Sequence, residues 1–295
     1  MNPDKPIYTF LGHHKAATTW MLGVINSICS QTGIEHKHFH NEKMFDFDLL
    51  NTIKQHKINF FSYTNANIDY IKPIINEIRG FHLIRDPRDV VVSAYFSHLY
   101  SHSTEFWPEL EDHRKELQSL SKDEGLMLTI KEIDSLKVDG INLNAIHSID
   151  KWNYSCPNIL EIKFEDLIVN PYSIILDVFD FIEIVDESTR VLDFSTRSII
   201  KLIIKRFVAA LNPSSLVRSR DNKISPFTIL NIVYMNDFKH LTKGRKTGEE
   251  DVKHHFRKGK SGDWKNHFNE AHKTYFKQKY PKLLVKLGYE ENDNW

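Results

Sequence analysis

Residues 7–33 have the pattern of a β-strand, a short polar loop and an α-helix. The run IYTFL is typical of a buried strand, and GHHKAATT is small and polar. The following WMLGVINSICSQTG has helical spacing and ends at a glycine. A loop that leads from a strand into a helix points free backbone N–H groups and the positive helix end at one spot. This pattern favours the binding of an anion such as a phosphate.

Side chains in this loop also suit an anion, since Lys15 adds a mobile positive charge and Thr18 and Thr19 add hydroxyl donors. The nucleotide-binding pattern GxxxxGK[ST] is not met, because Lys15 follows a histidine and no glycine lies between Gly12 and the helix. This difference argues against a standard ATPase or GTPase. A plain strand-to-helix turn would need no ligand, so the segment alone leaves both interpretations open.

A second strand, turn and helix are predicted in IRGFHLIRDPRDVVVSAYFSH, residues 78–98. Arg85 follows the buried run of the strand, and Ser93 falls in the second turn of the following helix. Ligands of open α/β sheets bind at the carboxyl ends of the strands. Arg85 and the Lys15 loop would therefore meet if their strands are neighbours.

The third segment, FRKGKSGDWKNHF at residues 256–268, combines fixed positive charge, two glycines and a tryptophan. Arg257 and Lys258 suit a phosphate group. The glycines let the backbone approach a ligand closely, where a Cβ would obstruct it. Trp264 is expected to pack the loop against the core.

Composition narrows the function further. The chain has 295 residues and a formal net charge of zero, so it lacks the global basic field of a non-specific nucleic-acid-binding protein. Cys29 and Cys156 form neither a disulfide framework nor a metal motif, which suits a reducing compartment. The first apolar run is too short for a signal peptide or a membrane span. We expect one domain over residues 1–295, located in the cytoplasm, with no nucleic-acid partner.

Together the three segments resemble the cofactor-binding signatures of the sulfotransferases that use 3′-phosphoadenosine 5′-phosphosulfate (PAPS). GHHKAATTW is similar to the family's 5′-phosphosulfate loop, usually KxGTTW, with Ala17 where glycine is common. The second segment resembles RxPxDxxxS and the third RKGxxGDWKNxF, so the match runs from end to end. The resemblance implies an α/β fold with a central, mainly parallel sheet flanked by helices, in a P-loop-NTPase-like sulfotransferase architecture.

The resemblance also implies a role for each matching residue. Lys15 would bind the bridging oxygen and stabilise charge on the departing phosphate. Thr18 and Thr19 would hold the 5′-phosphate with the loop amides, and Trp20 would stack beside the adenine. The cations and the serine of the second and third segments would bind the 3′-phosphate. The full cofactor-binding set is His14, Lys15, Ala16, Ala17, Thr18, Thr19, Trp20, Arg85, Ser93, Arg257, Lys258 and Gly259.

The implied reaction is in-line transfer of a sulfuryl group from PAPS to an acceptor hydroxyl or amine, which leaves 3′,5′-adenosine bisphosphate (PAP). No metal is expected, because positioning and charge stabilisation do most of the catalysis. A hydroxyl acceptor also needs a general base. In the cytosolic branch this base is usually a histidine in a KTHLP-like strand, whereas the corresponding FFSYTNANI has Asn65 there. The base must therefore come from elsewhere.

The segment IEHKHFHNEKMFDFD offers candidates for the base. In the glycan- and tyrosine-modifying branches a glutamate follows the second strand, and Glu42 resembles it. If residues 34–41 are extended, His36, His38 and His40 share one face, with Glu42 just past the end on the same side. We expect Glu42 as base, with His40 as the alternative. Three alternating histidines would also suit a metal, but no other feature supports one. The catalytic set is Lys15, Glu42, His40 and Ser93.

Other charged residues are interpreted structurally. Arg88 and Asp89 are expected to be solvated or locally paired rather than ligands. Glu165 and Asp166 lie in a stretch that resembles the family's "YED" element, and their acidity suits a helix N-terminus without any catalytic role.

Two variable segments, near residues 97–140 and 196–245, are expected on the acceptor side. Residues 196–223 are cationic, and a helix over about residues 198–211 would have a wide apolar face, which most often packs in a core. Peripheral membrane contact stays open but is not favoured. The acceptor, a small molecule, a lipid or a glycan, is not fixed by these segments. The KxxxTVxxxE dimer motif of the cytosolic branch is not matched after DWKN, so that dimer is not predicted.

Two rival functions share parts of this pattern. A kinase or another nucleotide-dependent phosphotransferase would use the same strand, loop and helix, but would need the missing Walker-type Gly-Lys pair. A non-catalytic nucleotide-binding protein would keep the phosphate loops, yet would have no need of Lys15.

Overall fold

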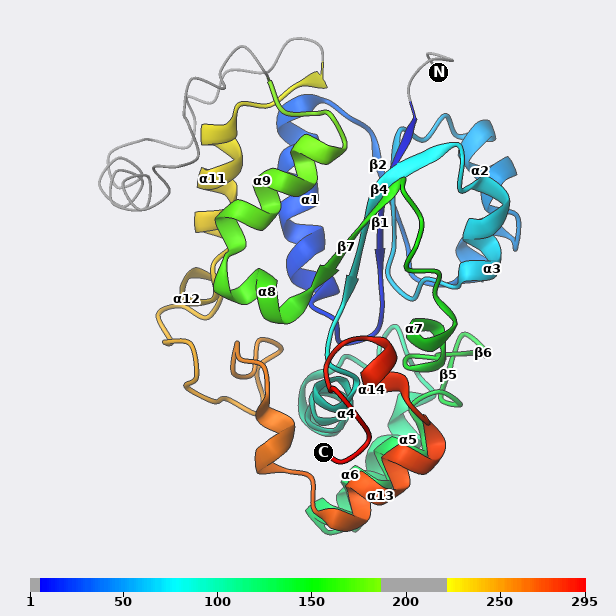
Figure 1. Ribbon diagram of the computed structural model, residues 1–295, viewed down its shortest axis with the longest axis vertical. Helices are drawn as coiled ribbons and strands as arrows, with labels where there is room; N and C mark the ends of the chain where they lie inside the picture. The colour runs from blue at the N-terminus through cyan, green and yellow to red at the C-terminus, as the bar shows by residue number, and fades with distance from the viewer. Residues whose placement is uncertain (1–5, 187–221) are drawn as a thin grey trace.

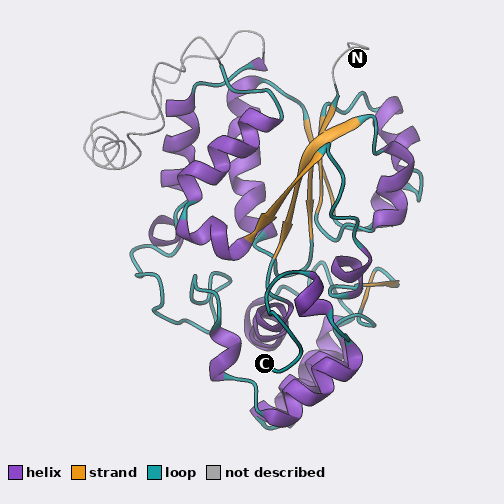
Figure 2. Ribbon diagram, in the orientation of Figure 1, coloured by secondary structure: helices purple, strands orange, loops and turns teal. Residues whose placement is uncertain are grey.

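A five-stranded parallel sheet forms the centre of the protein (Figures 1 and 2). The computed structural model describes residues 6–186 and 222–295. Every neighbouring pair of strands in this sheet is parallel, in the order β2-β3-β1-β4-β7. The predicted α/β class with a mainly parallel sheet is therefore confirmed. The strands are β1 (Ile7–Gly12), β2 (His36–Phe39), β3 (Phe60–Tyr63), β4 (Ile78–Ile84) and β7 (Ile159–Lys163).

Helices cover both faces of the sheet, so the central strands are buried on both sides (Figure 1). Alternation along β1 directs Phe10 into one core and Leu11 into the other. The Phe10 core lies under α1 (Thr18–Thr32), α8 (Phe164–Val169), α9 (Pro171–Phe181) and α11 (Pro226–Met235). The Leu11 core lies under α2 (Leu49–Gln55), α3 (Ile68–Ile71) and the short η2 (Lys72–Ile74).

A third, helical layer packs beyond the carboxyl ends of the strands, at the bottom of Figure 1. Its own apolar core joins segments from the middle and the end of the chain. A two-stranded antiparallel hairpin, β5 (Lys137–Val138) and β6 (Ile141–Asn142), lies at its edge. The helices are α4 (Pro87–Phe96), η3 (Ser97–Ser101), α5 (Leu110–Ser119), α6 (Lys122–Glu132), α7 (His147–Lys151), α13 (Glu270–Lys279) and α14 (Leu283–Lys286).

Short elements complete the chain near the strand ends. They are η1 (Glu42–Phe45), α12 (Phe238–Leu241) and η9 (Asp263–Asn266). The helix expected over residues 198–211 lies outside the described residues, as does most of the cationic segment 196–223. Within residues 6–186 and 222–295, no helix has both the length and the apolar character that a membrane crossing requires.

Candidate functional site

The loop between β1 and α1 has a backbone shaped by close packing. Gly12 ends the strand, and a Cβ there would lie 2.8 Å from Thr18 Cγ2, so only glycine fits. Lys15 and Ala17 both have positive φ angles, 62° and 58°. Ala17 is the residue before α1, and a left-handed alanine costs about 1 kcal/mol relative to the glycine common in the resembling family.

This loop opens into a cavity of about 780 Å³ at the carboxyl ends of the strands. The three segments identified in the sequence meet at this cavity. The first two follow strand ends, and the third, residues 256–268, packs against them. All the predicted cofactor-binding residues line it except Ala16, which is fully buried. The lining members of that set are His14, Lys15, Ala17, Thr18, Thr19, Trp20, Arg85, Ser93, Arg257, Lys258 and Gly259.

Lys15 occupies an electrostatically strained position in this cavity. Burial, followed by the nearby Arg85 and Arg257 cations, lowers the pKa of Lys15 to about 7. Its Nζ donates a hydrogen bond to Ser97 Oγ at 2.8 Å. Like charges brought together out of water repel each other unless an anion separates them. The cavity is therefore built to receive a strong anion between these cations.

Arg85 lies 8% exposed at the end of β4 and is only loosely held by the protein. Its Nη atoms donate to the carbonyls of Lys15 and Lys260 at 3.3 and 3.4 Å, and its buried Nε has no partner among the described residues. The Phe164 ring lies 4.6 Å from the guanidinium carbon. A guanidinium with long hydrogen bonds and an unused donor retains capacity for a phosphate oxygen.

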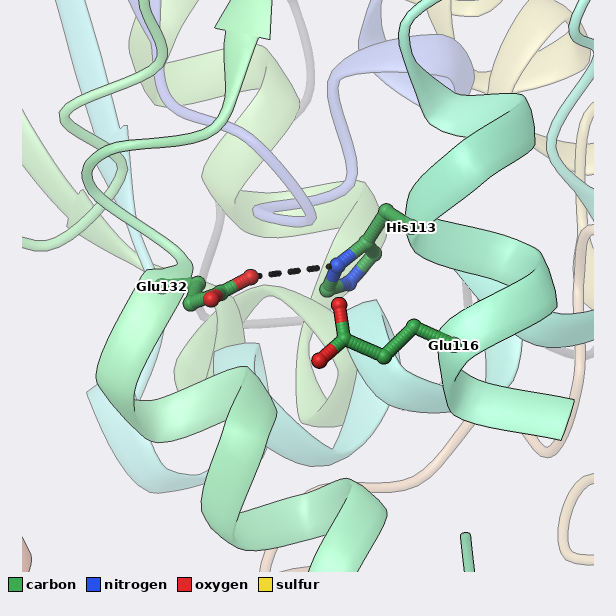
Figure 3. Close-up of side chains that lie close together, drawn as sticks. All are labelled: His113, Glu116 and Glu132. Carbon is green, nitrogen blue, oxygen red and sulfur yellow. Dashed lines mark ion pairs between the residues drawn. The ribbon is translucent and has the colours of Figure 1, made fainter. Parts of the chain in front are cut away.

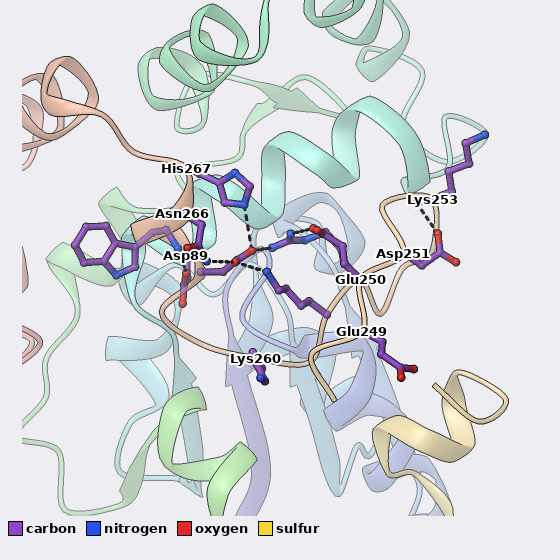
Figure 4. Close-up of polar contacts among 12 residues, drawn as sticks. Asp89, Glu249, Glu250, Asp251, Lys253, Lys260, Asn266 and His267 are labelled. Atoms are coloured by element: carbon purple, nitrogen blue, oxygen red, sulfur yellow. Dashed lines mark hydrogen bonds and ion pairs between the residues drawn. The ribbon is translucent and has the colours of Figure 1, made fainter. Parts of the chain in front are cut away.

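Asp263 organises the cations of the third segment, a role that the sequence did not indicate. Its side chain, 2% exposed, accepts from Arg257 Nη2 and from Lys258 Nζ, each at 2.6 Å. Arg257 also pairs with Glu250. Hydrogen bonds from His267, Lys258, Asn266 and Arg257 hold the pKa of Asp263 well below its usual range. Figure 4 shows Asn266 and His267 in this network, beside Asp89.

Arg88 and Asp89 were expected to be solvated or locally paired. The solvated alternative is wrong, since they are 2% and 1% exposed, whereas Arg88 does have a local ion-pair partner. Asp89 accepts from the backbone N–H groups of Gly262 and Trp264 at 2.6 and 2.9 Å. Arg88 lies 3.8 Å from the Trp264 ring centre and pairs with Asp86 at 2.7 Å. Both side chains lie on α4 and contact Gly262 or Trp264, so they hold the third segment against this helix. The third segment in turn covers them, which explains their burial.

Trp264 and Glu165 have the structural contacts that were expected. Trp264 is 6% exposed and packs against Phe268 and Trp295. Glu165 accepts from the Asp86 amide at 3.1 Å and from the Tyr289 hydroxyl at 2.9 Å. Both residues therefore tie the ends of the strands to the C-terminal part of the chain.

The expected position of Glu42 beside the histidines is wrong. The chain turns into η1 after Asn41, which buries Glu42 at 7% exposure and directs it to Asn67 Nδ2, 3.1 Å away. Glu42 does not line the large cavity but a much smaller one beside it, and Asn65 lines both. The extended backbone on which the alternation depends ends at Asn41, so Glu42 does not continue the histidine face.

His40 lies in the large cavity, next to Asn65. Its Nδ1 is 3.2 Å from Thr64 Oγ1, and its Nε2 is 3.2 Å from Asn65 Nδ2. Burial lowers the pKa of His40, although the Asp139 charge opposes this shift. A neutral imidazole whose Nε2 faces an amide donor has its lone pair on that nitrogen, engaged by Asn65. An acceptor hydroxyl that displaces this hydrogen bond could give its proton to Nε2.

The neighbouring His36 and His38 are held by hydrogen bonds. His36 lies 2.8 Å from both Asn26 Oδ1 and Ser62 Oγ. His38 Nε2 lies 3.0 Å from Thr64 Oγ1 and lines the cavity together with His40. The alternating histidines thus serve as hydrogen-bonding groups along the sheet edge.

Two further histidines in the lining were not indicated by the sequence. His102 and His255 come from segments far apart in the chain, and burial lowers the pKa of each to about 4. His14 also lines the cavity, and its Nε2 lies 2.9 Å from the Nε2 of the buried His98. The only signal in the sequence was the high count of 16 histidines, which does not specify positions.

The comparisons with known proteins agree with this geometry. Residues 224–288, which include the third segment, match the family model of the sulfotransferase domain. No curated protein sequence matches the chain. Among solved structures, the mouse sulfotransferase SULT7A1 complexed with PAP has a TM-score of 0.53 at 17% identity, covering 97% of this chain and 86% of that one. A retinol dehydratase in complex with androsterone and the inactive cofactor PAP has a TM-score of 0.51 at 15% identity, covering 96% and 82%.

The structural likeness shows that this chain has the fold of those proteins. The matched domain contains the cationic loop that closes the cavity, and the cavity unites all three predicted segments. By its fold the chain is similar to those sulfotransferases, and its match to the sulfotransferase domain covers residues 224–288.

Proposed function

We propose that the protein transfers a sulfuryl group from PAPS to a hydroxyl group of an acceptor that binds on the histidine-lined side of the cavity. The observation that carries this proposal is the convergence of Lys15, Arg85 and Arg257 in one cavity, where burial and mutual repulsion lower the pKa of Lys15 to about 7. A donor with phosphate groups at both ends would separate and neutralise these cations.

The donor would lie across the strand ends with its two phosphate groups held by different segments. The amides and hydroxyls of Thr18 and Thr19, at the start of α1, would bind the 5′-phosphate. The cations of the second and third segments would bind the 3′-phosphate, with Ser93 of α4 as a further donor. Trp20 is fixed by its Nε1 hydrogen bond to the Asn236 carbonyl at 2.6 Å and would stack beside the adenine.

The chemistry that these residues would support is a single in-line displacement. The acceptor oxygen forms a bond to sulfur while the bond from sulfur to the bridging phosphate oxygen breaks, so that PAP leaves with the electron pair. Lys15 Nζ stabilises the negative charge on that oxygen. His40 Nε2 takes the acceptor proton. We favour His40 over Glu42 as base because only His40 lines this cavity.

The cavity has a mostly apolar lining that also includes several histidines. His38, His40, His102 and His255 line it, and burial lowers the pKa of all four, so they are neutral imidazoles at pH 7. A neutral imidazole can donate one hydrogen bond and accept another, so it suits a hydroxyl group as a partner. These imidazoles support an acceptor that carries a hydroxyl group, and the apolar part of the lining would pack against the rest of that molecule.

Two features of the wider setting complete the proposal. Cys29 is a buried free thiol and Cys156 a half-buried one, which supports a reducing, cytoplasmic location. No observation in the described residues favours the kinase alternative, because the loop before α1 lacks the Walker-type Gly-Lys pair.

A direct test is PAP release from PAPS, followed by mass spectrometry with a panel of acceptors. The panel would include an oligosaccharide, a phenol, a long-chain alcohol and an amine. We expect the mass of a hydroxyl-bearing acceptor to rise by about 80 Da, the mass of an added SO3 group. PAP binding with no transfer to any acceptor in the panel would favour the non-catalytic alternative.

A further inference from the structure

Three metal-ligating side chains converge at a place that the transfer reaction does not use (Figure 3). His113 and Glu116 lie one turn apart on α5, so both face the same side of that helix. Glu132 is the last residue of α6 and points at them. One ligand atom from each side chain lies within 4.8 Å of the others. None of the three residues lines the large cavity.

The His113 ring is buried without a hydrogen-bond partner. The residue is 5% exposed, and neither Nδ1 nor Nε2 makes a hydrogen bond within the described residues. Nδ1 lies 3.3 Å from Glu132 Oε2, close enough for an ion pair but outside hydrogen-bond geometry. Buried polar groups are nearly always satisfied, so an imidazole aimed at two carboxylates without a hydrogen bond indicates a missing ligand.

Neither carboxylate is directly paired with a cation in the described residues, although the Lys279 and Lys131 charges lie near enough to act on Glu132. In the part of the chain that the structure describes, no lysine or arginine forms an ion pair with Glu116 or Glu132. Lys115, the neighbour of Glu116, pairs instead with Glu111 and Asp112. Two like charges beside a buried imidazole favour the binding of a cation that replaces the missing counter-charge.

We propose that His113, Glu116 and Glu132 bind a divalent transition-metal cation of the zinc type. An imidazole nitrogen and two carboxylate oxygens are ligands that Zn²⁺ accepts at about 2.0–2.2 Å, with water completing a tetrahedron. Glu116 is exposed, so its side chain can rotate to close the remaining distance and solvent can reach the fourth position. Mg²⁺ prefers oxygen ligands in octahedral geometry and does not suit the imidazole.

The metal would join α5 to α6 behind one wall of the large cavity. The His113 ring packs edge-on against His98, with ring centres 5.7 Å apart. His98 in turn contacts His14, the residue before Lys15. The expected role is structural, because the metal would lie outside the cavity. This structural metal is compatible with the prediction that sulfuryl transfer needs no metal, because the two concern different places in the protein.

The test is calorimetric titration of the chelator-treated full chain with Zn²⁺, together with thermal unfolding in its presence. We expect saturable binding of one ion and a rise in Tm that Mg²⁺ does not produce. His113→Gln and Glu132→Gln should lose this binding. Glu116→Gln changes an exposed residue that the fold does not need, and it should weaken binding at least tenfold.

Glu111→Gln is the matched control, since Glu111 is an exposed acid on the same helix that pairs only with Lys115. It should bind Zn²⁺ as the unmodified chain does. Absence of saturable Zn²⁺ binding would overturn the proposal, and so would binding that survives in both Glu116→Gln and Glu132→Gln. PAP binding measured on the same samples keeps this result separate from the proposed transferase function.

Discussion

The two carboxylate oxygens of Asp263 hold Arg257 and Lys258, each at 2.6 Å. This carboxylate sets the direction of two cations that line the cavity, and it does so from a buried position. Without this partner, a flexible arginine and a flexible lysine would have to be ordered when the phosphate binds, and the entropy cost of that ordering would weaken binding. Asp263 is thus a positioning residue for the proposed 3′-phosphate site.

Asp263→Asn should reduce the unfolding free energy by about 3 kcal/mol, because it removes the counter-charge that Lys258 and Arg257 share and leaves Arg257 paired with Glu250. Urea denaturation at pH 7 measures this loss. The difference should shrink as the pH falls below about 4, because the depressed pKa of Asp263 gives stability that is present above its unfolded pKa and lost in acid. Asp251→Asn is the control, since the Asp251 carboxylate accepts a local hydrogen bond from the Lys253 amide, which an asparagine oxygen can also accept. Equal stability of the two variants would contradict this role.

Lys15→Ala should lower kcat by about 100- to 1,000-fold, the usual effect of removing one donor that stabilises a developing negative charge. The fold should persist, since the Lys15 side chain forms one hydrogen bond, to Ser97. Steady-state kinetics with PAPS give the measurement. The exposed Lys37→Ala on β2 serves as control. A fall in PAPS affinity with unchanged kcat would mean that Lys15 only binds the donor.

PAP affinity should fall as the pH rises above about 7. The free protein has a lowered Lys15 pKa of about 7, and a bound phosphate raises it, so binding takes up a proton between that value and the ordinary 10.5. Calorimetry in buffers of different ionisation heat detects this proton directly. The effect should vanish in Lys15→Ala. A pH-independent affinity between 7 and 9 would show that the phosphate does not contact Lys15.

His40→Gln should lower kcat by about 100-fold or more while PAP affinity stays unchanged, because the imidazole acts on the acceptor proton alone. Glu42→Gln should keep turnover within a few-fold, since Glu42 faces Asn67 rather than the cavity. The pair therefore serves as a test and its control. Loss of turnover in Glu42→Gln with full activity in His40→Gln would restore the assignment that the sequence first suggested.

The parallel sheet and the part of the cavity lining that comes from the three segments were predictable because their signals are local. A buried run followed by a polar loop predicts a strand end, and parallel strands bring such ends together, which united the Lys15 loop with Arg85. The roles of Asp89 and Asp263 were not predictable, because they depend on contacts across 173 positions or on burial by distant segments. Glu42 was misplaced because strand alternation continues only as far as the strand, and β2 ends at Phe39.

Calorimetric titration of the protein with PAP, and separately with ATP and GTP, tests the central claim most directly. PAP carries the 3′-phosphate that Arg85, Arg257 and Lys258 are proposed to bind, and ATP does not. We predict one PAP per chain with at least tenfold preference over ATP, a difference of about 1.4 kcal/mol. Tighter binding of ATP than of PAP would contradict the account.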